Sequence, residues 1–416
     1  MSVKDWLGDQ AKSMIQSKPG ATARKWLGLE PTIAANHELD RISVSGTVVV
    51  YFSDAVQKSY QLEQWLPTLE ELNKHHRVVL VFRKVQALRY FRRLTSLPKI
   101  FLRRFEDLVT FYNHNDFRIC LYVNNGVANF QSLSAPQLVH VHINHGESDK
   151  LSMVSNQAKA YDKVFVAGQA AIERHRRALY DFDLSKLVSV GRPQLDNDYD
   201  PIIDPFEGRT IMYAPTWEGE NEQNNYTSID VYGVKIVQTI LSQPDTRVLY
   251  KPHPRIASST NKAVVEAHLA IVQILEESSE RGIPNNYVEA GDILAHFQST
   301  DGMITDISSV GLDYLYLCPE KPLVLTDRRN NQALLNTDAP ISKACPVITE
   351  GNEEDILTRW AEYSQPESVA LRAEMRSYYF GTNNSLTSTQ AFLDAIDQLL
   401  ASRSESVKKR NQEIVE

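Results

Sequence analysis

Short apolar runs alternate with longer polar or amphipathic stretches in the first half of the chain. The runs occupy residues 46–52, 77–82, 118–123, 138–143, 163–168 and 186–191. They are too continuously apolar for strands with one solvated face, and segments of helical length separate them. This pattern is typical of βαβ units and predicts a parallel sheet covered by helices on both faces.

A second series of apolar runs follows an interruption. Residues 191–208 are rich in Pro, Asp and Gly, and strand-like runs then recur at 210–215, 247–252, 302–305 and 322–327. We interpret the interruption as a linker and the second series as another α/β domain. Two Rossmann-like domains joined in this way would face each other across a cleft at the carboxyl ends of their sheets, where such folds bind ligands.

The pattern predicts the following segments. An amphipathic N-terminal segment covers 1–40, the first Rossmann-like domain 41–190, the linker 191–208, the second Rossmann-like domain 209–402, and a solvated tail 403–416. The second domain ends with a helix-like stretch, and the tail is polar enough to remain in solvent.

Composition narrows the class of protein. The chain has 416 residues, 42% of them hydrophobic, so it can bury two cores and is not a disordered chain. Its net charge of −8 and the lack of a nucleic-acid motif argue against a nucleic-acid partner. Cys120, Cys318 and Cys345 are far apart and odd in number, which fits a reducing cytoplasm. No apolar run approaches the roughly 18 residues of a spanning helix, and we expect no signal peptide.

A candidate catalytic segment follows the strand expected at 138–143. His145 and Gly146 come directly after this strand, and Lys150 lies at the start of the next stretch, which we expect to be helical. An imidazole can take a hydroxyl proton near neutral pH, and glycine lets the backbone approach a ligand closely. We expect His140 and His142 to pack in the sheet. A zinc site of the three histidines is possible, but no neighbouring Cys or carboxylate completes a recognised ligand set, so we predict no metal centre.

His253 is held in a second strand-end segment. It lies between Pro252 and Pro254, which restrict its backbone, and Lys251 and Arg255 lie close by in the sequence. A histidine restrained beside two cations could meet an anionic phosphate. An ordinary turn histidine is the alternative interpretation.

A third segment combines hydroxyl groups with a helix start. Thr305 and Asp306 follow a predicted strand, and Ser308 and Ser309 begin a predicted helix. Free N–H groups at a helix start, together with the positive end of its dipole, form a site for anions, although capping alone would explain one serine. Thr216 occupies a comparable strand end earlier in the domain.

These motifs together resemble those of the CDP-glycerol glycerophosphotransferases of teichoic-acid and capsule synthesis. The resemblance rests on His145-Gly146-x3-Lys150, Gly191-x-Pro193-x2-Asp196, Ala214-Pro215-Thr216-Trp217, Pro252-His253-Pro254, and Thr305-Asp306-x-Ser308-Ser309 continued by Asp313-Tyr314 and Lys321-Pro322. The motifs occur in the family's order and cover roughly residues 45–400.

The resemblance implies a GT-B-like fold with two facing Rossmann-type domains and the transfer of glycerol phosphate from CDP-glycerol to an acceptor hydroxyl, with release of CMP. The acceptor would be a lipid-linked or polymeric cell-envelope molecule. By similarity, His145 would deprotonate the acceptor hydroxyl and His253 would stabilise charge on the pyrophosphate or leaving phosphate. The donor or phosphate would be bound by Gly146, Thr216, Lys251, Arg255, Thr305, Asp306, Ser308 and Ser309.

Three positions depart from the family pattern. The family often has a basic residue where this chain has Gln194 and Glu218, and an Arg where it has Lys251. Each change removes or weakens a cationic contact with phosphate. CDP-ribitol or another CDP-linked polyol is therefore an alternative donor.

Residues 82–105 are unusually basic. The stretch contains eight Lys or Arg and no acidic residue, interleaved with Tyr90, Phe91, Leu94, Phe101 and Phe105. This composition predicts contact with an anionic membrane surface or a polyanionic acceptor, and solvated cations over a packed core are the alternative. The predicted contact residues are Arg89, Arg92, Arg93, Lys99, Arg103 and Arg104. The N-terminal segment could add a second surface contact.

The sequence thus predicts a cytoplasmic transferase that is peripheral at the inner face of the cell membrane. A GT-B glycosyltransferase that uses a nucleotide sugar and a noncatalytic envelope-assembly protein are the two other hypotheses. A divalent cation such as Mg²⁺ could assist, although no ligand set points to one. Oligomeric state, and priming as against polymerising activity, have no signal in the sequence.

Overall fold

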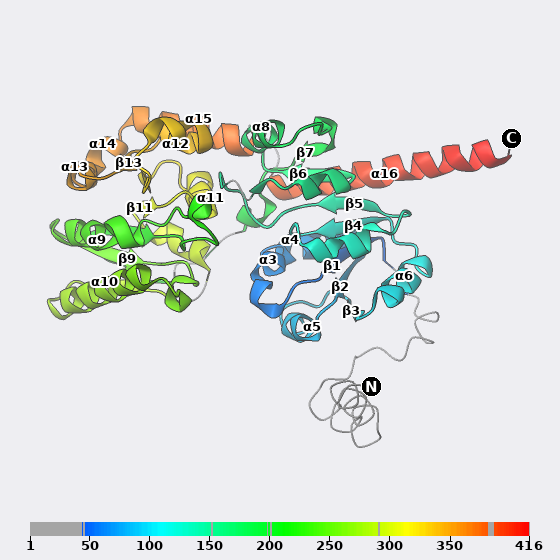
Figure 1. The fold of residues 1–416 in the computed structure, drawn as a ribbon, viewed down its shortest axis with the longest axis horizontal. Coiled ribbons are helices and arrows are strands. Elements are labelled where there is room, and N and C mark those ends of the chain that lie inside the picture. Colours follow the sequence, from blue (N-terminus) through cyan, green and yellow to red (C-terminus); the bar gives the residue numbers. More distant parts are fainter. Residues whose placement is uncertain are drawn as a thin grey trace, which may run out of the picture. The chain divides into compact units, whose positions relative to one another are not determined.

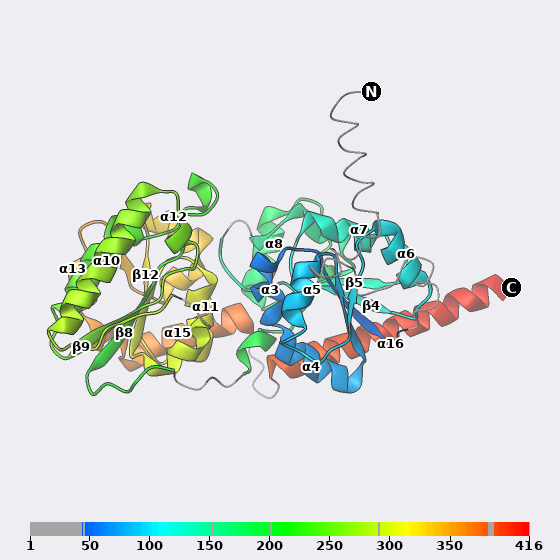
Figure 2. The ribbon, with the colours of Figure 1, turned by 90° about the horizontal axis from the view of Figure 1, so that it is seen from below.

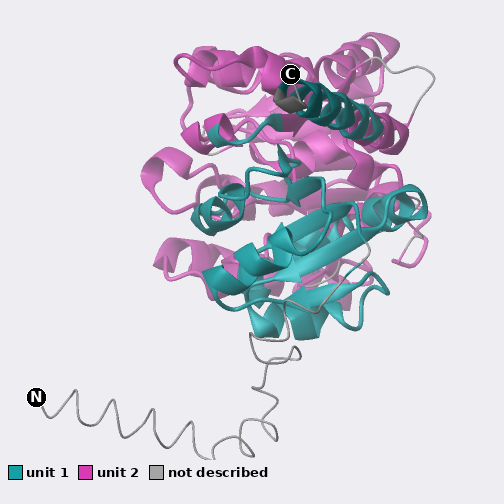
Figure 3. Ribbon diagram, turned by 90° about the vertical axis from the view of Figure 1, so that its right-hand side faces the viewer, with its two compact units in different colours: residues 1–145, 160–163, 397–416 teal, residues 146–159, 164–396 magenta. Residues whose placement is uncertain are grey.

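The computed structural model describes residue 44 and residues 46–150, 153–197, 199, 202–289, 292–381 and 387–415. The chain forms two compact units, shown in separate colours in Figure 3. Unit 1 comprises residues 1–145, 160–163 and 397–416, and unit 2 comprises residues 146–159 and 164–396. The predicted amphipathic segment 1–40 lies outside the described residues.

The first sheet is parallel and has the strand order β3-β2-β1-β4-β5-β6-β7. Its strands are β1 (Val48–Phe52), β2 (Val78–Phe82), β3 (Lys99–Phe101), β4 (Ile119–Tyr122), β5 (Val139–His142), β6 (Lys163–Val166) and β7 (Leu187–Ser189). In register, Val48 pairs with Val78 of β2 and with Ile119 of β4. All six apolar runs of the first half of the chain form strands, as predicted, and β3 is an additional strand inside the basic stretch.

Helices alternate with these strands along the chain, as the pattern predicts (Figure 1). They are α3 (Tyr60–Glu63), α4 (Leu66–His75), α5 (Val85–Phe91), α6 (Phe105–Asn113), α7 (Phe130–Leu133) and α8 (Gln169–Ala178). Leu69 and Leu72 of α4 and Phe111 of α6 are fully buried with the β1 and β2 side chains. The continuous Val, Leu and Phe content of these strands is explained by this burial.

The second sheet, in unit 2, is also parallel and has the order β10-β9-β8-β11-β12-β13. Its strands are β8 (Arg209–Ala214), β9 (Thr246–Tyr250), β10 (Asn286–Tyr287), β11 (Gly302–Thr305), β12 (Leu323–Thr326) and β13 (Val347–Ile348). The four predicted runs form β8, β9, β11 and β12. The two outer strands have two residues each, too few to show a hydrophobic pattern.

Both faces of the second sheet are buried. On β8, Ile211 and Tyr213 pack in a core with helices α9 (Val234–Leu241) and α10 (Lys262–Glu280). The intervening Met212 and Ala214 pack in a second core with α11 (Ser309–Leu317) and α15 (Pro366–Phe380). Figure 2 shows α10 on one side of these strands and α11 and α15 on the other.

The remaining helices are α12 (Gln332–Asp338), α13 (Glu353–Thr358), α14 (Trp360–Tyr363) and α16 (Ser388–Val415). The helix expected to end near residue 402 continues to Val415, so the predicted tail is helical. Within unit 1, the Arg403 guanidinium donates two hydrogen bonds to the Gln137 carbonyl, at 3.1 and 2.8 Å. The residues at 405–413 are exposed.

Strand order indicates the ligand edge of unit 2 without reference to any motif. From β8 the chain proceeds outward through β9 and β10, and then returns to the opposite side of β8 for β11, β12 and β13. Ligands of open α/β sheets bind at the carboxyl ends of the strands where the order reverses. The loops that follow β8, β9, β11 and β12 meet at this edge.

Candidate active site

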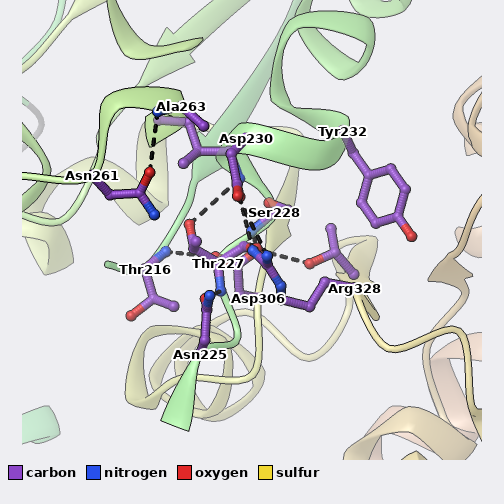
Figure 4. Close-up of polar contacts among 12 residues, drawn as sticks. Thr216, Asn225, Thr227, Ser228, Asp230, Tyr232, Asn261, Ala263, Asp306 and Arg328 are labelled. Carbon is purple, nitrogen blue, oxygen red and sulfur yellow. Dashed lines mark hydrogen bonds and ion pairs between the residues drawn. The ribbon is translucent and has the colours of Figure 1, made fainter. Parts of the chain in front are cut away.

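The Asp306 carboxylate links the loop after β8 to the end of β12. It accepts hydrogen bonds from the Thr216 N–H at 2.6 Å, the Ser228 N–H at 3.1 Å and the Thr326 hydroxyl at 2.7 Å (Figure 4). The Asp306 side chain has no exposed surface, and burial raises its pKa to about 6. The resemblance led us to expect Asp306 in the lining of the donor pocket. In this structure its oxygens accept hydrogen bonds from three donors inside the protein, and a contact with the donor molecule stays a prediction.

The segment that contains Ser228 was not identified from the sequence. Residues 225–229 are buried, and Ser228 precedes a π-helical turn, Ile229–Gly233, that continues into α9. The Asp306 carboxylate therefore lies at the positive end of this helix, where a negative charge is stabilised. Arg328 reinforces the segment by donating to Asp230 at 2.8 Å and to the Thr227 carbonyl at 2.8 Å (Figure 4). A run of Asn, Thr and Ser before an apolar helix is a recognisable helix-start signal, and it could have indicated this segment.

Helix α11 begins at the loop after β11. Ser308 is its N-cap in an extended conformation, makes no side-chain capping bond, and is half-buried like Ser309. Thr305, by contrast, is fully buried and donates its hydroxyl to the Ala214 carbonyl at 2.7 Å. The two serines lie at the start of α11, and their contact with an anion stays a prediction. Thr305 binds the sheet instead of lining a pocket.

The loop after β5 reaches α11 from within unit 2. A Cβ atom built on Gly146 would lie 3.8 Å from the Ser309 Cβ, so the glycine backbone is adjacent to the α11 N-terminus. Farther along the loop, the Lys150 ammonium donates to the Thr216 hydroxyl at 3.0 Å and lies 5.7 Å from the centre of the Tyr226 ring. Burial lowers the Lys150 pKa, and the Asp306 charge opposes this shift. Lys150 thus joins the site, although the sequence indicated it only as part of a motif.

His253 has a defined tautomer. The His253 backbone N–H donates to the Pro215 carbonyl at 3.0 Å. The ring Nδ1 accepts a hydrogen bond from the Arg255 backbone N–H at 3.1 Å. Nδ1 therefore carries no proton, and in the neutral ring the proton is on Nε2. Burial and the positive charges of Lys150, Arg255 and Lys251 lower the pKa of His253 to about 4. At neutral pH the ring is an uncharged hydrogen-bond donor.

The cations near His253 are held in place by aromatic and carbonyl groups. The Arg255 guanidinium carbon lies 4.2 Å from the centre of the Trp217 ring. The Lys251 ammonium approaches the Glu289 carbonyl at 3.4 Å, and burial lowers the Lys251 pKa. Lys150, Lys251 and Arg255 all act on the His253 pKa. A phosphate bound here would be near three positive charges and would raise the His253 pKa again.

His145 belongs to unit 1 and is described there by itself. Its ring Nδ1 lies 3.2 Å from the Val123 carbonyl, and its ring packs edge-on against Tyr60 with centroids 5.9 Å apart. A carbonyl can only accept, so Nδ1 is protonated and the lone pair of the neutral ring is on Nε2. The preceding Asn144 has φ of 52°, and its carbonyl accepts the Trp65 indole N–H at 2.5 Å.

The two strand histidines are packed, as the sequence predicted. His140 is buried between the Tyr122 hydroxyl, 2.8 Å from Nδ1, and the Ala135 carbonyl, 2.9 Å from Nε2. His142 is buried and stacks on Tyr161 with ring centroids 5.2 Å apart. Among the described residues, no group of three or more His, Cys, Asp or Glu is arranged to hold a metal ion.

The basic stretch of unit 1 is partly core and partly surface. Phe91 on α5 and Phe101 on β3 are buried, as expected from the alternative in which the apolar residues of the stretch pack in the core. Lys99 is partly buried, and its ammonium donates to the Thr95 and Leu97 carbonyls at 2.6 and 2.7 Å. Arg89 is half-buried. The exposed remainder, which we call the basic patch, consists of Arg92, Arg93, Arg103 and Arg104 with Leu94 and Phe105.

Comparisons with solved structures show the fold. A putative UDP-N-acetylglucosamine 2-epimerase from Listeria monocytogenes has 15% identity and a TM-score of 0.58, with 86% of this chain and 98% of that chain covered. The wall teichoic acid polymerase TagF has 14% identity and a TM-score of 0.54, with 88% and 91% covered. Anabaena Alr3699/HepE in complex with UDP has 12% identity and a TM-score of 0.52, with 86% and 100% covered. No curated protein sequence matches the chain.

The two parallel sheets and the likeness to these structures show the GT-B type of fold. The family described as CDP-Glycerol:Poly(glycerophosphate) glycerophosphotransferase has a sequence model that matches residues 43–328. The chain belongs to this family. Both the predicted fold class and the predicted family are thus confirmed, and within the described residues no helix is long and apolar enough to cross a membrane.

Proposed function

We propose that this protein transfers glycerol phosphate from CDP-glycerol to a hydroxyl of a lipid-linked or polymeric cell-envelope acceptor of the teichoic-acid or capsule type, and releases CMP. One observation in unit 2 carries the proposal. The positive charges of Lys150, Lys251 and Arg255 all lower the pKa of His253. Ser308 and Ser309 lie at the N-terminus of α11. Family membership supports the choice of a CDP-linked donor.

The arrangement suits phosphoryl transfer, which depends on positioning and on neutralising oxygen charge. The pyrophosphate would accept hydrogen bonds from the α11 N-terminus and from Nε2–H of His253, near the Lys150 ammonium. The acceptor oxygen attacks the phosphorus that bears the glycerol. The bond from this phosphorus to the bridging oxygen breaks, and CMP leaves with the bridging oxygen and its electron pair.

His145 would remove the proton of the acceptor hydroxyl. With Nδ1 protonated beside the Val123 carbonyl, the lone pair that would take the proton is on Nε2. A positioned base typically contributes about 10²- to 10⁴-fold to the rate. The role of His145 therefore predicts a larger loss in the acceptor-dependent reaction than in donor binding.

The basic patch would bring the enzyme to the inner face of the cell membrane, where lipid-linked acceptors are found. Arg92, Arg93 and Arg103 are exposed, and Leu94 and Phe105 are each 40% exposed beside them. Each cation near an anionic surface contributes about 1 kcal/mol, and the apolar side chains can enter the headgroup region. A polyanionic acceptor is the alternative ligand of the patch.

The experiment is CMP release from CDP-glycerol, with and without a membrane fraction, by the wild type and by His145→Ala and His253→Ala. We expect acceptor-dependent release that both changes abolish. Parallel reactions with EDTA and with added Mg²⁺ test whether a divalent cation assists. Turnover of CDP-ribitol or a nucleotide sugar, but not of CDP-glycerol, would refute CDP-glycerol as the donor. No turnover of any of these donors would favour a noncatalytic role.

A further inference from the structure

A pocket in unit 2 lies beside the phosphate site and has no role in the reaction described so far. It has a volume of about 410 Å³, including its open mouth. Its walls come from the loops after β11 and β12, from helix α12 and from the loops that contain Asp149 and Tyr226. The polar and apolar lining residues used below are Asp327, Arg328, Arg329, Asp338, Leu334 and Leu335.

The pocket is continuous with the proposed phosphate site through shared residues. Ile307 lines it and is adjacent in sequence to Ser308, the N-cap of α11. Tyr226 also lines it, and the centre of the Tyr226 ring is 5.7 Å from the Lys150 ammonium. A group covalently attached to a phosphate at the α11 N-terminus is therefore close enough to enter the pocket.

The two arginines of the lining are already engaged. Arg328 forms an ion pair with Asp230 at 2.8 Å. Arg329 donates to the Gln223 carbonyl at 2.5 Å and lies 4.4 Å from the centre of the Tyr226 ring. Tyr226 is the one aromatic residue of the lining, so a cation already occupies the space over the ring where a base would stack.

Carboxylates are among the hydrogen-bond acceptors that line the pocket. Asp327 is oriented by the N–H groups of Arg329 at 3.0 Å and Asn331 at 2.8 Å. Asp338 ends helix α12, and its carboxylate has no hydrogen-bond or ion-pair partner among the described residues. Carboxylates repel phosphate oxygens and accept hydrogen bonds from hydroxyl groups. Apolar side chains, Leu334 and Leu335, complete the wall and can contact a carbon chain.

We propose that this pocket binds the polyol of the CDP-linked donor, and that its acidic wall and its length determine which polyol phosphate the enzyme transfers. The inference rests on the proposed function, because it assumes a donor whose phosphates lie at the α11 N-terminus. Asp338 accepts a hydroxyl of the polyol, and Leu334 sets the space at the mouth of the pocket.

The test measures equilibrium binding by calorimetry to CDP, CDP-glycerol and CDP-ribitol. Asp338→Asn removes the charge with little change of shape, and Asp355→Asn on α13 is the matched control, since Asp355 is exposed and pairs only with Arg359 among the described residues. A hydrogen bond to a charged group is worth enough for about a tenfold effect. We expect Asp338→Asn to weaken the binding of CDP-glycerol about tenfold and to leave the binding of CDP unchanged.

A second variant tests the space in the pocket. Leu334 is 43% exposed, so Leu334→Trp is compatible with folding and narrows the mouth; Leu371→Trp on α15, at a position 50% exposed, is its control. We expect Leu334→Trp to weaken CDP-ribitol more than CDP-glycerol, because ribitol is the longer polyol.

The outcomes distinguish a failure of the pocket inference from a failure of the proposed function. Equal weakening of CDP and CDP-glycerol by Asp338→Asn would place the nucleoside in the pocket and overturn the inference alone. Normal binding of all three ligands by both variants would also overturn it and leave the proposed function intact. A wild-type protein that binds no cytidine nucleotide would overturn the proposed function and the inference together.

Discussion

Arg174 on α8 provides the sharpest test of how the site is assembled. Its guanidinium donates to Glu147 at 2.5 Å and to Asp149 at 2.8 Å, and the three side chains are 13%, 6% and 3% exposed. The Tyr379 hydroxyl of α15 also donates to Asp149. These bonds fix the loop that carries Gly146 and Lys150 to the α11 N-terminus. Arg174→Gln removes the charge and leaves two buried carboxylates without their cation.

The expected loss follows from that burial. Removing one partner of a buried ion pair costs about 3–5 kcal/mol, so we expect Arg174→Gln to lower the free energy of unfolding by about 3 kcal/mol at pH 8. Arg174→Lys keeps the positive charge but loses the paired donors of the guanidinium group. We expect it to lower the free energy of unfolding by about 1 kcal/mol. The control is Arg176→Gln on the same helix, whose side chain is exposed, with an expected change below about 0.5 kcal/mol.

The loss has a predictable pH dependence. Burial raises the Asp149 pKa to about 6, and the Arg174 charge opposes this rise. Without Arg174 the folded-state pKa is higher still, while the unfolded value stays near 4. An acid whose pKa is raised by folding loses stability as pH rises between the two values. The difference between variant and wild type should therefore grow from pH 5.5 to pH 8.

The assay is urea unfolding followed by tryptophan fluorescence, paired with CMP release under the same conditions. Because Arg174 positions Lys150 and does not touch the donor, KM for CDP-glycerol should rise more than kcat falls. A loss below about 1 kcal/mol, or one that is independent of pH, would refute the claim that the two buried carboxylates depend on Arg174.

Three other predictions follow from the same geometry. His253→Gln keeps an N–H donor and should retain measurable acceptor-dependent CMP release, whereas His253→Ala should show none. The pH profile of kcat/KM in the wild type should show no ionisation of His253 above about pH 5, because its pKa is about 4. Asp306→Asn places an amide N–H against backbone donors and should cost about 2–3 kcal/mol in urea unfolding, whereas Asp355→Asn should not. Replacing the four arginines of the basic patch by Gln should weaken sedimentation with anionic vesicles by about 10²- to 10³-fold and leave soluble CDP binding unchanged; equal binding to neutral vesicles would contradict the electrostatic role.

Much of the fold is local information. Strands buried on both faces must be apolar throughout, so the runs at 46–52 and 77–82 were visible as β1 and β2. Strand β3 was not visible, because three residues that begin with Lys99 carry no pattern. Two-residue strands such as β13 are formed by pairing with a neighbour and not by their own composition.

The site was predictable as a set of loops but not as a set of roles. Ser308 and Ser309 could be placed at a helix start because capping residues precede an apolar helix in the sequence. The burial of Thr305 and Asp306, two residues of the same motif, depends on the Ala214 carbonyl and the Ser228 N–H, which lie far away in sequence. A motif therefore identifies which residues act together, but not which of them face a ligand.

The sequence by itself determined the parallel α/β class, the family, and the positions of the strand-end loops, because hydrophobic period and motif order are properties of short segments. The tertiary structure decided the charge state of His253, the burial of Asp306 and the fixing of the 146–150 loop by Arg174. Each of these depends on desolvation and on charges brought together from distant segments. Such effects exist only once the chain has folded.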